Sequence, residues 1–249
     1  MPKNISHSEC QTSNSSFRTP NSSLLTSDST LLTPNSSLHK PSPTLYYETA
    51  LWNQGILLIA GIDEAGRGAW AGPVTAGAVI LPADPNILNR LAGVRDSKLM
   101  TPAEREAMFD VVIAEAQTWA VGEADAEEID HIGILNATKN AMKRAFEALN
   151  PQPVHLLIDY VRLHDVTIPQ TGIKHGDMLS LSIACASVLA KVTRDRFMRT
   201  TAAELYPQYH FDQHKGYGTK LHQEMLAQYG HCPIHRRSFR PLADKLTLF

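Results

Sequence analysis

Apolar stretches of strand length alternate with polar and turn-forming residues from about residue 56 onward. Residues 56–62, 74–81, 118–122 and 154–159 are runs of this kind, and a glycine-rich turn separates the first two. Short apolar runs that are bounded by turn residues are typical of buried strands. The pattern therefore predicts a sheet built from the first two thirds of the chain.

Helices are predicted between and after these strands. Thr101 is followed by Pro102 and then by Glu104, which is the pattern of a helix start with a capping box and a proline at the first helical position. The expected helices are about 101–117, 125–150, 177–200 and 219–229. Because strands come first and helices dominate later, we expect an α/β fold with a mixed sheet flanked by helices and a helical C-terminal part.

The first 50 residues differ in composition from the rest of the chain. Ser, Thr, Asn and Pro dominate this segment, and a Thr-Pro-Asn-Ser-Ser-Leu hexapeptide occurs in it twice, at 19–24 and 33–38. The segment has too little apolar surface to offset the entropy of ordering it. We therefore predict a disordered tail at residues 1–50 and one folded domain at residues 51–249. The role of the tail stays open, and organelle targeting is one alternative.

Composition narrows the setting of the protein. The 249-residue chain has a net charge of −2, so only a local patch of charge could bind a polyanion. The three cysteines, Cys10, Cys185 and Cys232, are too few and too far apart for a disulfide framework, which favours a reducing compartment. No apolar run approaches the roughly 20 residues of a membrane span. We expect a soluble, cytoplasmic monomer without a membrane segment.

Four carboxylates stand out by their positions in the predicted elements. Asp63 and Glu64 follow the first strand, Asp159 ends the last strand, and Asp177 begins a helix. Acids at the ends of neighbouring strands can converge, and such oxygen-rich clusters suit Mg²⁺ or Mn²⁺. Asp177 could instead cap its helix, and Asp159 could cap a turn. The adjacent pair at the end of an apolar run has no obvious structural task and favours a cation site.

A second candidate site comes directly after this pair, in the sequence Gly66-Arg67-Gly68. Glycines let a ligand approach the bare backbone, so this loop could dock an anionic group. Further along the chain, Lys191 and Arg194 are three apart in a predicted helix and share a face that a polyanion could use. A solvated charged face is the usual meaning of such a run, and the residues alone leave both interpretations open.

Histidines near the C-terminus raise the question of a zinc site. His210 and His214 are four apart, and His231 and Cys232 precede His235. Histidines at a spacing of four can bind zinc when they lie on a helix. The residues between the first two have a loop-like pattern, so we interpret these histidines as structural or surface groups.

Several motifs of the chain resemble the signature of the ribonuclease HII family and occur in the family's order. They are Gly61-Ile62-Asp63-Glu64-Ala65-Gly66-Arg67-Gly68 with Ala71-Gly72-Pro73-Val74, then Asp96-Ser97-Lys98-Leu99, Asp159, Gly176-Asp177, the run from Ser182 to Asp195, Gly216-Tyr217-Gly218-Thr219 and His235-Arg236-Arg237-Ser238-Phe239. The resemblance covers about residues 55–241. Trp70 and Cys185 depart from the expected pattern. Trp70 could pack over its loop or touch substrate, and Cys185 can serve as a small hydrophobic residue.

The resemblance implies an RNase H-like mixed sheet flanked by helices, with the catalytic domain at residues 51–249. It implies a metal-dependent endonuclease that hydrolyses the RNA strand of RNA–DNA hybrids and cuts on the 5′ side of ribonucleotides embedded in duplex DNA. The products would carry 3′-hydroxyl and 5′-phosphate ends. Such an activity would serve ribonucleotide removal and RNA primer removal in DNA replication and repair.

The resemblance also implies a role for each matching residue. The implied metal ligands, which are also the catalytic residues of a site for two Mn²⁺ or Mg²⁺ ions, are Asp63, Glu64, Asp159 and Asp177. The backbone of Gly66, Arg67 and Gly68 would read the 2′-hydroxyl group, and Tyr217 would stack at the junction between ribonucleotide and deoxynucleotide. The implied phosphate contacts are Lys98, Ser187, Lys191 and Arg194.

Two alternatives accompany this prediction. Ribonuclease HIII shares the acid set, but it typically carries a folded N-terminal substrate-binding domain, for which residues 1–50 lack strands and apolar residues. A catalytically silent hybrid-binding module would gain nothing from concentrating negative charge near phosphates. We therefore favour the ribonuclease HII-like enzyme.

Overall fold

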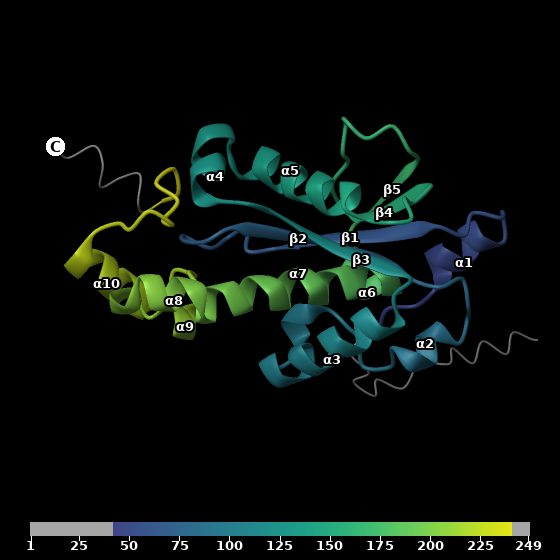
Figure 1. Ribbon diagram of the computed structural model, residues 1–249, viewed down its shortest axis with the longest axis horizontal. Coiled ribbons are helices and arrows are strands. Elements are labelled where there is room, and N and C mark those ends of the chain that lie inside the picture. Colours follow the sequence, from purple (N-terminus) through teal and green to yellow (C-terminus); the bar gives the residue numbers. More distant parts are fainter. Residues whose placement is uncertain (1–41, 241–249) are drawn as a thin grey trace, which may run out of the picture. The chain divides into compact units, whose positions relative to one another are not determined.

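A mixed five-stranded sheet lies between helical layers in the computed structural model, which describes residues 42–240 (Figure 1). The strand order is β3-β2-β1-β4-β5. The strands are β1 (Ile59–Ala65), β2 (Val74–Ile80), β3 (Thr118–Ala124), β4 (His155–Asp159) and β5 (Gln170–Ile173). The predicted α/β class is confirmed, and only β5 lies outside the predicted strands.

The pairing of the strands brings two carboxylate-bearing positions to one edge of the sheet. β1 runs antiparallel to β2 and parallel to β4, with Ile62 opposite Ile158. Asp63 and Asp159 are the next residues on these two strands. Because parallel strands run in the same direction, the register places these two residues next to each other.

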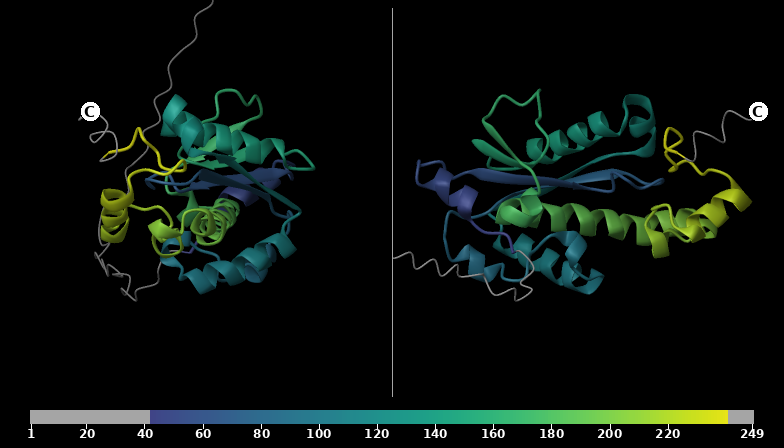
Figure 2. Two further views of the ribbon diagram at one scale, coloured as in Figure 1. Left: turned by 60° about the vertical axis from the view of Figure 1, so that its left-hand side comes forward. Right: turned by 180° about the vertical axis from the view of Figure 1, so that it is seen from behind.

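Helices cover both faces of the sheet (Figure 2). α5 packs on β1, β2 and β3, α7 packs on the opposite face of β1 and β2, and α3 packs on the outer side of α7. The helices are α1 (Tyr46–Trp52), α2 (Ile87–Arg90), the 3₁₀ helix η1 (Ser97–Leu99), α3 (Pro102–Glu115), α4 (Ala126–Ile132), α5 (Ile134–Glu147), α6 (Gly176–Leu179), α7 (Leu181–Arg199), α8 (Thr201–Leu205), the 3₁₀ helix η2 (Pro207–Tyr209), α9 (Phe211–His214) and α10 (Lys220–Tyr229). The predicted capping box is present at Thr101 and Glu104. Within residues 42–240, no helix combines the length and the apolar character that crossing a bilayer requires.

Two of the predicted helices are interrupted. The helix expected at 125–150 is divided into α4 and α5 at Gly133, whose φ of 80° ends the first helix. The helix expected at 177–200 begins as the short α6. Ser180 then caps α7 by accepting a hydrogen bond from the N–H of Ile183. Both divisions occur where a residue suited to a helix terminus stands inside the predicted run.

Helix α7 lies directly on the backbone of the two central strands. A Cβ atom on Gly61 would overlap the backbone of Ser182, and one on Gly77 would overlap the carbonyl group of Ala186. A larger residue at either strand position would push the helix away. The close approach brings α7 side chains to the part of the sheet where Asp63 lies.

Helix α1 corrects the predicted boundary of the folded domain. The sequence predicts disorder up to residue 50, whereas α1 covers Tyr46–Trp52; residues 1–41 lie outside the described part of the chain. Glu48 of α1 is buried, and its Oε1 accepts hydrogen bonds from Ser180 Oγ at 2.6 Å, Ser182 N at 2.9 Å and Ser182 Oγ at 2.7 Å. The helix is therefore fixed by partners far along the chain, which the composition of its own segment does not reveal.

We expect Glu48→Ala to lower the free energy of unfolding by about 3 kcal/mol, because three buried donors lose their acceptor. Glu48→Gln keeps one acceptor oxygen and should cost less. Urea denaturation followed by circular dichroism measures both variants. The exposed Glu127→Ala serves as a control and should change stability by no more than about 0.5 kcal/mol. Wild-type stability of Glu48→Ala would contradict the anchoring role.

Candidate active site

The four predicted carboxylates gather at one edge of the sheet. Asp63 and Glu64 lie within β1, Asp159 ends β4, and Asp177 lies in α6. The negative charges of the other three all act on Asp63, which is 4% exposed. The sequence predicts that the first strand ends before this pair, whereas β1 continues through Ala65 by pairing with β2. The two adjacent acids are thus held by strand pairing.

One donor holds each of the two carboxylates of β1. Arg67 Nη1 donates to Glu64 Oε1 at 3.0 Å, and Ser187 donates to the carboxylate of Asp63. The other oxygen of Glu64, Oε2, is buried without a hydrogen-bond partner among the described residues. A buried carboxylate oxygen without a donor is unfavourable, so this atom fits a site that a cation completes.

The remaining two carboxylates also have donors. The N–H of Gly176 donates to Asp159 Oδ1 at 2.8 Å, which ties the start of α6 to the end of β4. Lys98 Nζ lies 3.4 Å from Asp177 Oδ2, and the Lys98 side chain is 78% exposed. Lys98 therefore reaches the cluster from the solvent side, where it can also meet an incoming anion.

The pKa values of the cluster show uncompensated negative charge. Burial raises the pKa of Asp63 well above its ordinary value, and the charges of Glu64, Asp159 and Asp177 raise it further. Burial is also the first cause of the raised pKa of Glu64 and of Asp177. Protein donors thus neutralise only part of the charge.

The donor set fits a hard divalent cation by its chemistry, because it consists of carboxylate oxygens with excess negative charge. The carboxylates are turned toward their protein donors, and within residues 42–240 no three His, Cys, Asp or Glu side chains are already arranged as a closed set of metal ligands. The candidate ligands therefore lie at one edge of the sheet, but within residues 42–240 their oxygen atoms are not arranged around a common metal position.

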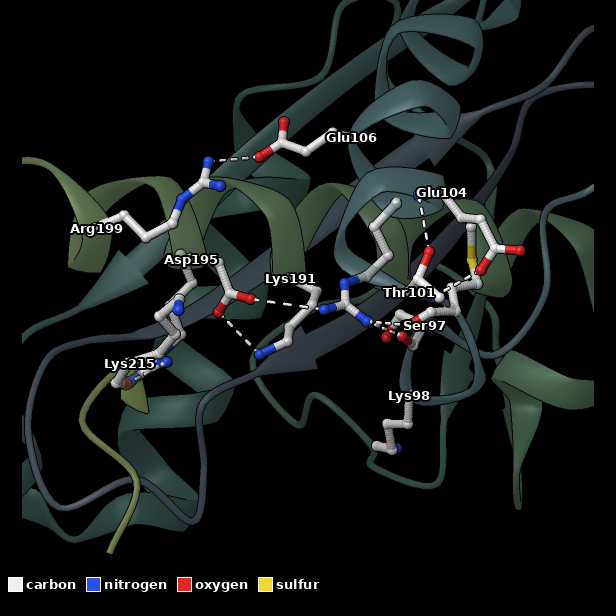
Figure 3. Close-up of polar contacts among 12 residues, drawn as sticks. Ser97, Lys98, Thr101, Glu104, Glu106, Lys191, Asp195, Arg199 and Lys215 are labelled. Atoms are coloured by element: carbon white, nitrogen blue, oxygen red, sulfur yellow. Dashed lines mark hydrogen bonds and ion pairs between the residues drawn. The ribbon is translucent and has the colours of Figure 1, made fainter. Parts of the chain in front are cut away.

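A polar network on α3 and α7 fixes the segment that carries Lys98 (Figure 3). Arg105 Nη1 donates to the carbonyl oxygen of Ser97 at 2.7 Å. Asp195 forms ion pairs with two side chains: its Oδ2 lies 4.0 Å from Arg105 Nη2, and its Oδ1 lies 2.8 Å from Lys191 Nζ. The same network therefore holds the Lys191 side chain and the backbone of Ser97, the residue before Lys98.

Arg194 corrects one phosphate contact that the resemblance implies. Its side chain is fully buried and donates to the carbonyl oxygens of Ala71 at 3.0 Å, Pro73 at 2.8 Å and Lys215 at 3.1 Å. A group that is enclosed in this way is not exposed to a phosphate. Arg194 instead joins the loop after β1 to the loop before α10.

Ser187, which the resemblance implies as another phosphate contact, is also buried. It is 2% exposed, and its Oγ lies 2.9 Å from Ser97 Oγ in addition to its bond with Asp63. Its place is therefore behind the carboxylate cluster. Lys191 is partly exposed and remains a candidate phosphate contact, as does Lys98.

A buried arginine that the sequence prediction did not single out supports the glycine loop. Gly66 has a φ of 90°, and the Arg67 side chain is 44% exposed. Arg236 is fully buried; its Nη1 donates to the carbonyl oxygen of Arg67 at 3.0 Å, and its Nε donates to that of Gly72 at 3.0 Å. The available signal was its place within the motif His235-Arg236-Arg237-Ser238-Phe239, which does not reveal burial.

Tyr217 lies half-buried beside the basic side of α7. Lys191 Nζ is 5.1 Å and Arg194 Cζ is 5.3 Å from the centroid of the Tyr217 ring. Both distances are within the range of cation–π contacts. The Tyr217 ring therefore contacts Lys191, a candidate phosphate contact, and Arg194, which bonds to the two loops.

The two departures from the family pattern have structural explanations. Trp70 packs on Gly218, where a Cβ atom would overlap its indole ring. This agrees with the first alternative for Trp70, packing over the loop. Cys185 of α7 is fully buried in the core, and burial raises the pKa of its thiol, so it serves as a small hydrophobic residue.

Comparison with known proteins agrees with the resemblance. The family model described as Ribonuclease HII matches residues 60–241. Ribonuclease HII of Dehalococcoides mccartyi is 52% identical over 205 residues, which cover 80% of this chain and 93% of the relative. Ribonuclease HII of Roseiflexus castenholzii is 52% identical over 207 residues, which cover 81% of this chain and 90% of the relative. These identities favour ribonuclease HII over the alternative of ribonuclease HIII.

Solved structures share the fold. The ribonuclease H2 from Pyrococcus horikoshii OT3 aligns with a TM-score of 0.61 at 27% identity, over 75% of this chain and 95% of that chain. The RNase HII in the PCNA:RNase HII complex from Archaeoglobus fulgidus aligns with a TM-score of 0.60 at 21% identity, over 74% of this chain and 96% of that chain. The chain therefore belongs to the ribonuclease HII family, whose enzymes are endoribonucleases that cleave the RNA of RNA–DNA hybrids.

Proposed function

We propose that the enzyme cuts on the 5′ side of ribonucleotides embedded in duplex DNA, as well as within the RNA strand of hybrids, and leaves 3′-hydroxyl and 5′-phosphate ends. One observation carries this proposal. The buried Arg194 and Arg236 bind the carbonyl oxygens of the loop that follows Asp63 and Glu64. Whatever this loop contacts on a nucleic acid is thus held at a fixed place relative to the carboxylates.

The loop suits recognition of a single ribose. Telling RNA from DNA at one nucleotide requires contact with the 2′-hydroxyl group, which both donates and accepts. A Cβ atom on Gly68 would meet nothing within 4 Å, so the backbone is open at Gly68, whereas Gly66 is buried against the Arg194 side chain. Tyr217 would supply the neighbouring stacking surface for the sugar or base at the junction.

The residues that would hold a divalent cation are Asp63, Glu64, Asp159 and Asp177, and their oxygen donors suit a pair of Mg²⁺ or Mn²⁺ ions. Such a pair, when bound, activates a water and stabilises the leaving oxygen of a phosphodiester. The chain's own groups prepare this site. Ser187 orients Asp63, and the N–H of Gly176 orients Asp159.

We further propose that the enzyme acts as a cytoplasmic monomer in ribonucleotide removal and RNA primer removal during DNA replication and repair. Its net charge of −2 gives no general attraction to nucleic acid. Duplex binding would then depend on local cations near the carboxylates, such as Arg67, Lys98 and Lys191. Contacts of this kind are independent of sequence and weaken as salt concentration rises.

The direct test is cleavage of a DNA duplex that contains one ribonucleotide. We expect a cut on its 5′ side with Mg²⁺ or Mn²⁺ and no cut in excess EDTA, because the carboxylates alone repel the phosphate. Denaturing gels of end-labelled strands locate the cut, and phosphatase sensitivity identifies the ends. The matched all-DNA duplex should stay intact. Failure of the folded protein to cut the ribonucleotide duplex with either metal would refute the proposal.

Asp63→Asn should abolish activity while stabilising the metal-free protein. The pKa of Asp63 is raised in the folded state. Below the unfolded pKa both states are protonated and stability is unaffected; above it the fold loses stability as pH rises, and the loss is complete above the folded pKa. At pH 7 the neutral variant avoids that loss. In EDTA we expect its melting temperature to be a few degrees higher than that of the wild type, with cleavage at least about 100-fold slower.

Differential scanning fluorimetry with and without Mn²⁺ measures this effect. Wild type should gain more stability from the ion than Asp63→Asn does, because the variant lacks one of the charges that the ion neutralises. Asp110→Asn, an exposed substitution on α3, is the matched control and should behave as the wild type. A lower melting temperature of Asp63→Asn in EDTA would contradict the repulsion argument.

Tyr217→Ala should slow cleavage at the embedded ribonucleotide by about 10- to 100-fold, which corresponds to the loss of one stacking contact. Tyr217→Phe keeps the ring and should stay close to the wild type. Single-turnover rates on the single-ribonucleotide duplex, together with binding measured by fluorescence anisotropy, separate a cleavage defect from a binding defect. Equal cleavage rates for Tyr217→Ala and the wild type would rule out the stacking role.

A further inference from the structure

Three buried histidines in the C-terminal part form a cluster beside Tyr217. His214, His222 and His235 are 7%, 0% and 1% exposed. His222 Nε2 lies 3.0 Å from His235 Nε2, and the rings of His214 and His222 stack with 4.4 Å between centroids. Their ring nitrogens contact one another and neighbouring backbone groups, which fits the interpretation of these histidines as structural groups.

The backbone determines which nitrogen of His235 carries the proton. The N–H of Cys232 lies 2.9 Å from His235 Nδ1. A backbone N–H can only donate, so Nδ1 accepts this shorter bond instead of donating to the Cys232 carbonyl oxygen at 3.3 Å, and the proton of the neutral ring is on Nε2. That Nε2–H then donates to His222 Nε2.

The same reasoning continues from His222 to Tyr217. Because His222 Nε2 accepts from His235, the proton of His222 is on Nδ1, which lies 3.0 Å from the carbonyl oxygen of Tyr217 and donates to it. Burial lowers the pKa of His222 to about 4, with the charge of His214 as the next cause. Burial and then the charge of His222 lower the pKa of His235 to about 3. Both rings are therefore neutral near pH 7, as the hydrogen-bond pattern requires.

The backbone on the other side of Tyr217 is held by His214. The N–H of Gly216 donates to His214 Nδ1 at 3.1 Å, so His214 Nε2 carries the proton and donates to the carbonyl oxygen of Tyr209 at 2.8 Å. The N–H of Tyr217 donates to the carbonyl oxygen of His214 at 3.0 Å. The N–H of Tyr217 therefore bonds to His214, and its carbonyl oxygen accepts from His222 Nδ1 and from the N–H of Thr219 at 2.8 Å.

Trp70 links this cluster to the glycine loop. Its backbone N–H donates to the carbonyl oxygen of Gly216 at 2.8 Å. The centroid of its ring lies 5.6 Å from that of the His222 ring. The Trp70 ring also occupies the space that a Cβ atom on Gly218 would need. Trp70 follows Gly68 by two residues, so the loop that would read the ribose and the loop that presents Tyr217 share one packed contact.

We propose that the hydrogen-bonded pair His235–His222 positions Tyr217 against the glycine loop. His235 orients His222, and His222 donates from its Nδ1–H to the Tyr217 carbonyl group. His222 and His235 are thus positioning residues, since they act on substrate only through Tyr217. The inference deepens the proposed function and rests on it, because Tyr217 would stack at the ribonucleotide–deoxynucleotide junction.

The kinetic test uses two substitutions of His222. Asn places an amide N–H near the position of the imidazole Nδ1–H, whereas Leu removes the donor and keeps a comparable apolar volume. On the single-ribonucleotide duplex we expect His222→Leu to lower kcat/KM by about 10- to 100-fold, as Tyr217→Ala does, and His222→Asn to stay within about 3-fold of the wild type. Cleavage of a continuous RNA–DNA hybrid, where no single junction must be found, should fall much less.

The double variant separates positioning from a general structural role. If His222 acts through Tyr217, adding His222→Leu to Tyr217→Ala should cause no further loss on the single-ribonucleotide duplex. Additive losses, an unchanged preference for the embedded ribonucleotide in His222→Leu, or equal defects in the Asn and Leu variants would each overturn the proposal.

A second measurement needs no substrate and no variant. Long-range ¹H–¹⁵N spectra of the ¹⁵N-histidine-labelled protein report the tautomer of each ring. Among the three clustered histidines, we expect the Nδ1–H form for His222 and the Nε2–H form for His214 and His235. An Nε2–H form of His222 would overturn the proposal even if His222→Leu did not fold. If the wild type fails to cut the single-ribonucleotide duplex while the tautomers are as expected, the proposed function is wrong. The hydrogen-bonded pair then has a structural role only.

Discussion

The contact between helix α7 and the backbone of the two central strands is the constraint on which the rest of the structure depends. Gly61 and Gly77 leave no side chain between the strands and the helix, so α7 lies as close as two backbones allow. From that position one helix serves three parts of the site. Its Ser187 meets the carboxylate of Asp63, its Arg194 binds the loop after β1, and Lys191 lies beside Tyr217. Moving the helix outward would separate all three at once.

The fold holds the carboxylates at the edge of the sheet together although their burial and their like charges are unfavourable. Strand pairing holds Asp63 and Glu64 in place, and the parallel register brings Asp159 beside them. The fold therefore keeps buried carboxylates together: burial raises the pKa of Asp63 and of Glu64, and the negative charges of neighbouring carboxylates raise it further. Such a cluster is unfavourable for stability by itself. It becomes favourable only with a cation, because binding to the folded state alone adds stability by mass action.

Local signals in the sequence were enough to predict most of the sheet and the position of Asp63 and Glu64. The features that the sequence prediction missed depend on partners far along the chain. Glu48 is fixed by serines 132 and 134 positions away, so the composition of its own segment indicates disorder. Arg194 has the spacing of a surface cation, yet tertiary packing buries it among carbonyl groups. Strand β5 is short and mostly not buried, and it gives no apolar run to recognise.

The two loops that carry the proposed recognition residues are held by a different electrostatic arrangement from that of the carboxylates. Two buried guanidinium groups, Arg194 and Arg236, donate to carbonyl oxygens, and burial followed by the charge of Arg194 lowers the pKa of Arg236 to about 9. Another positive charge nearby would be costly, so the bonds that hold Tyr217 come from neutral imidazoles instead. Directional hydrogen bonds without net charge can fix the two loops before any cation arrives. If the proposed function holds, a cation has only the carboxylates to arrange, and the two loops held by these hydrogen bonds determine the position of the cut.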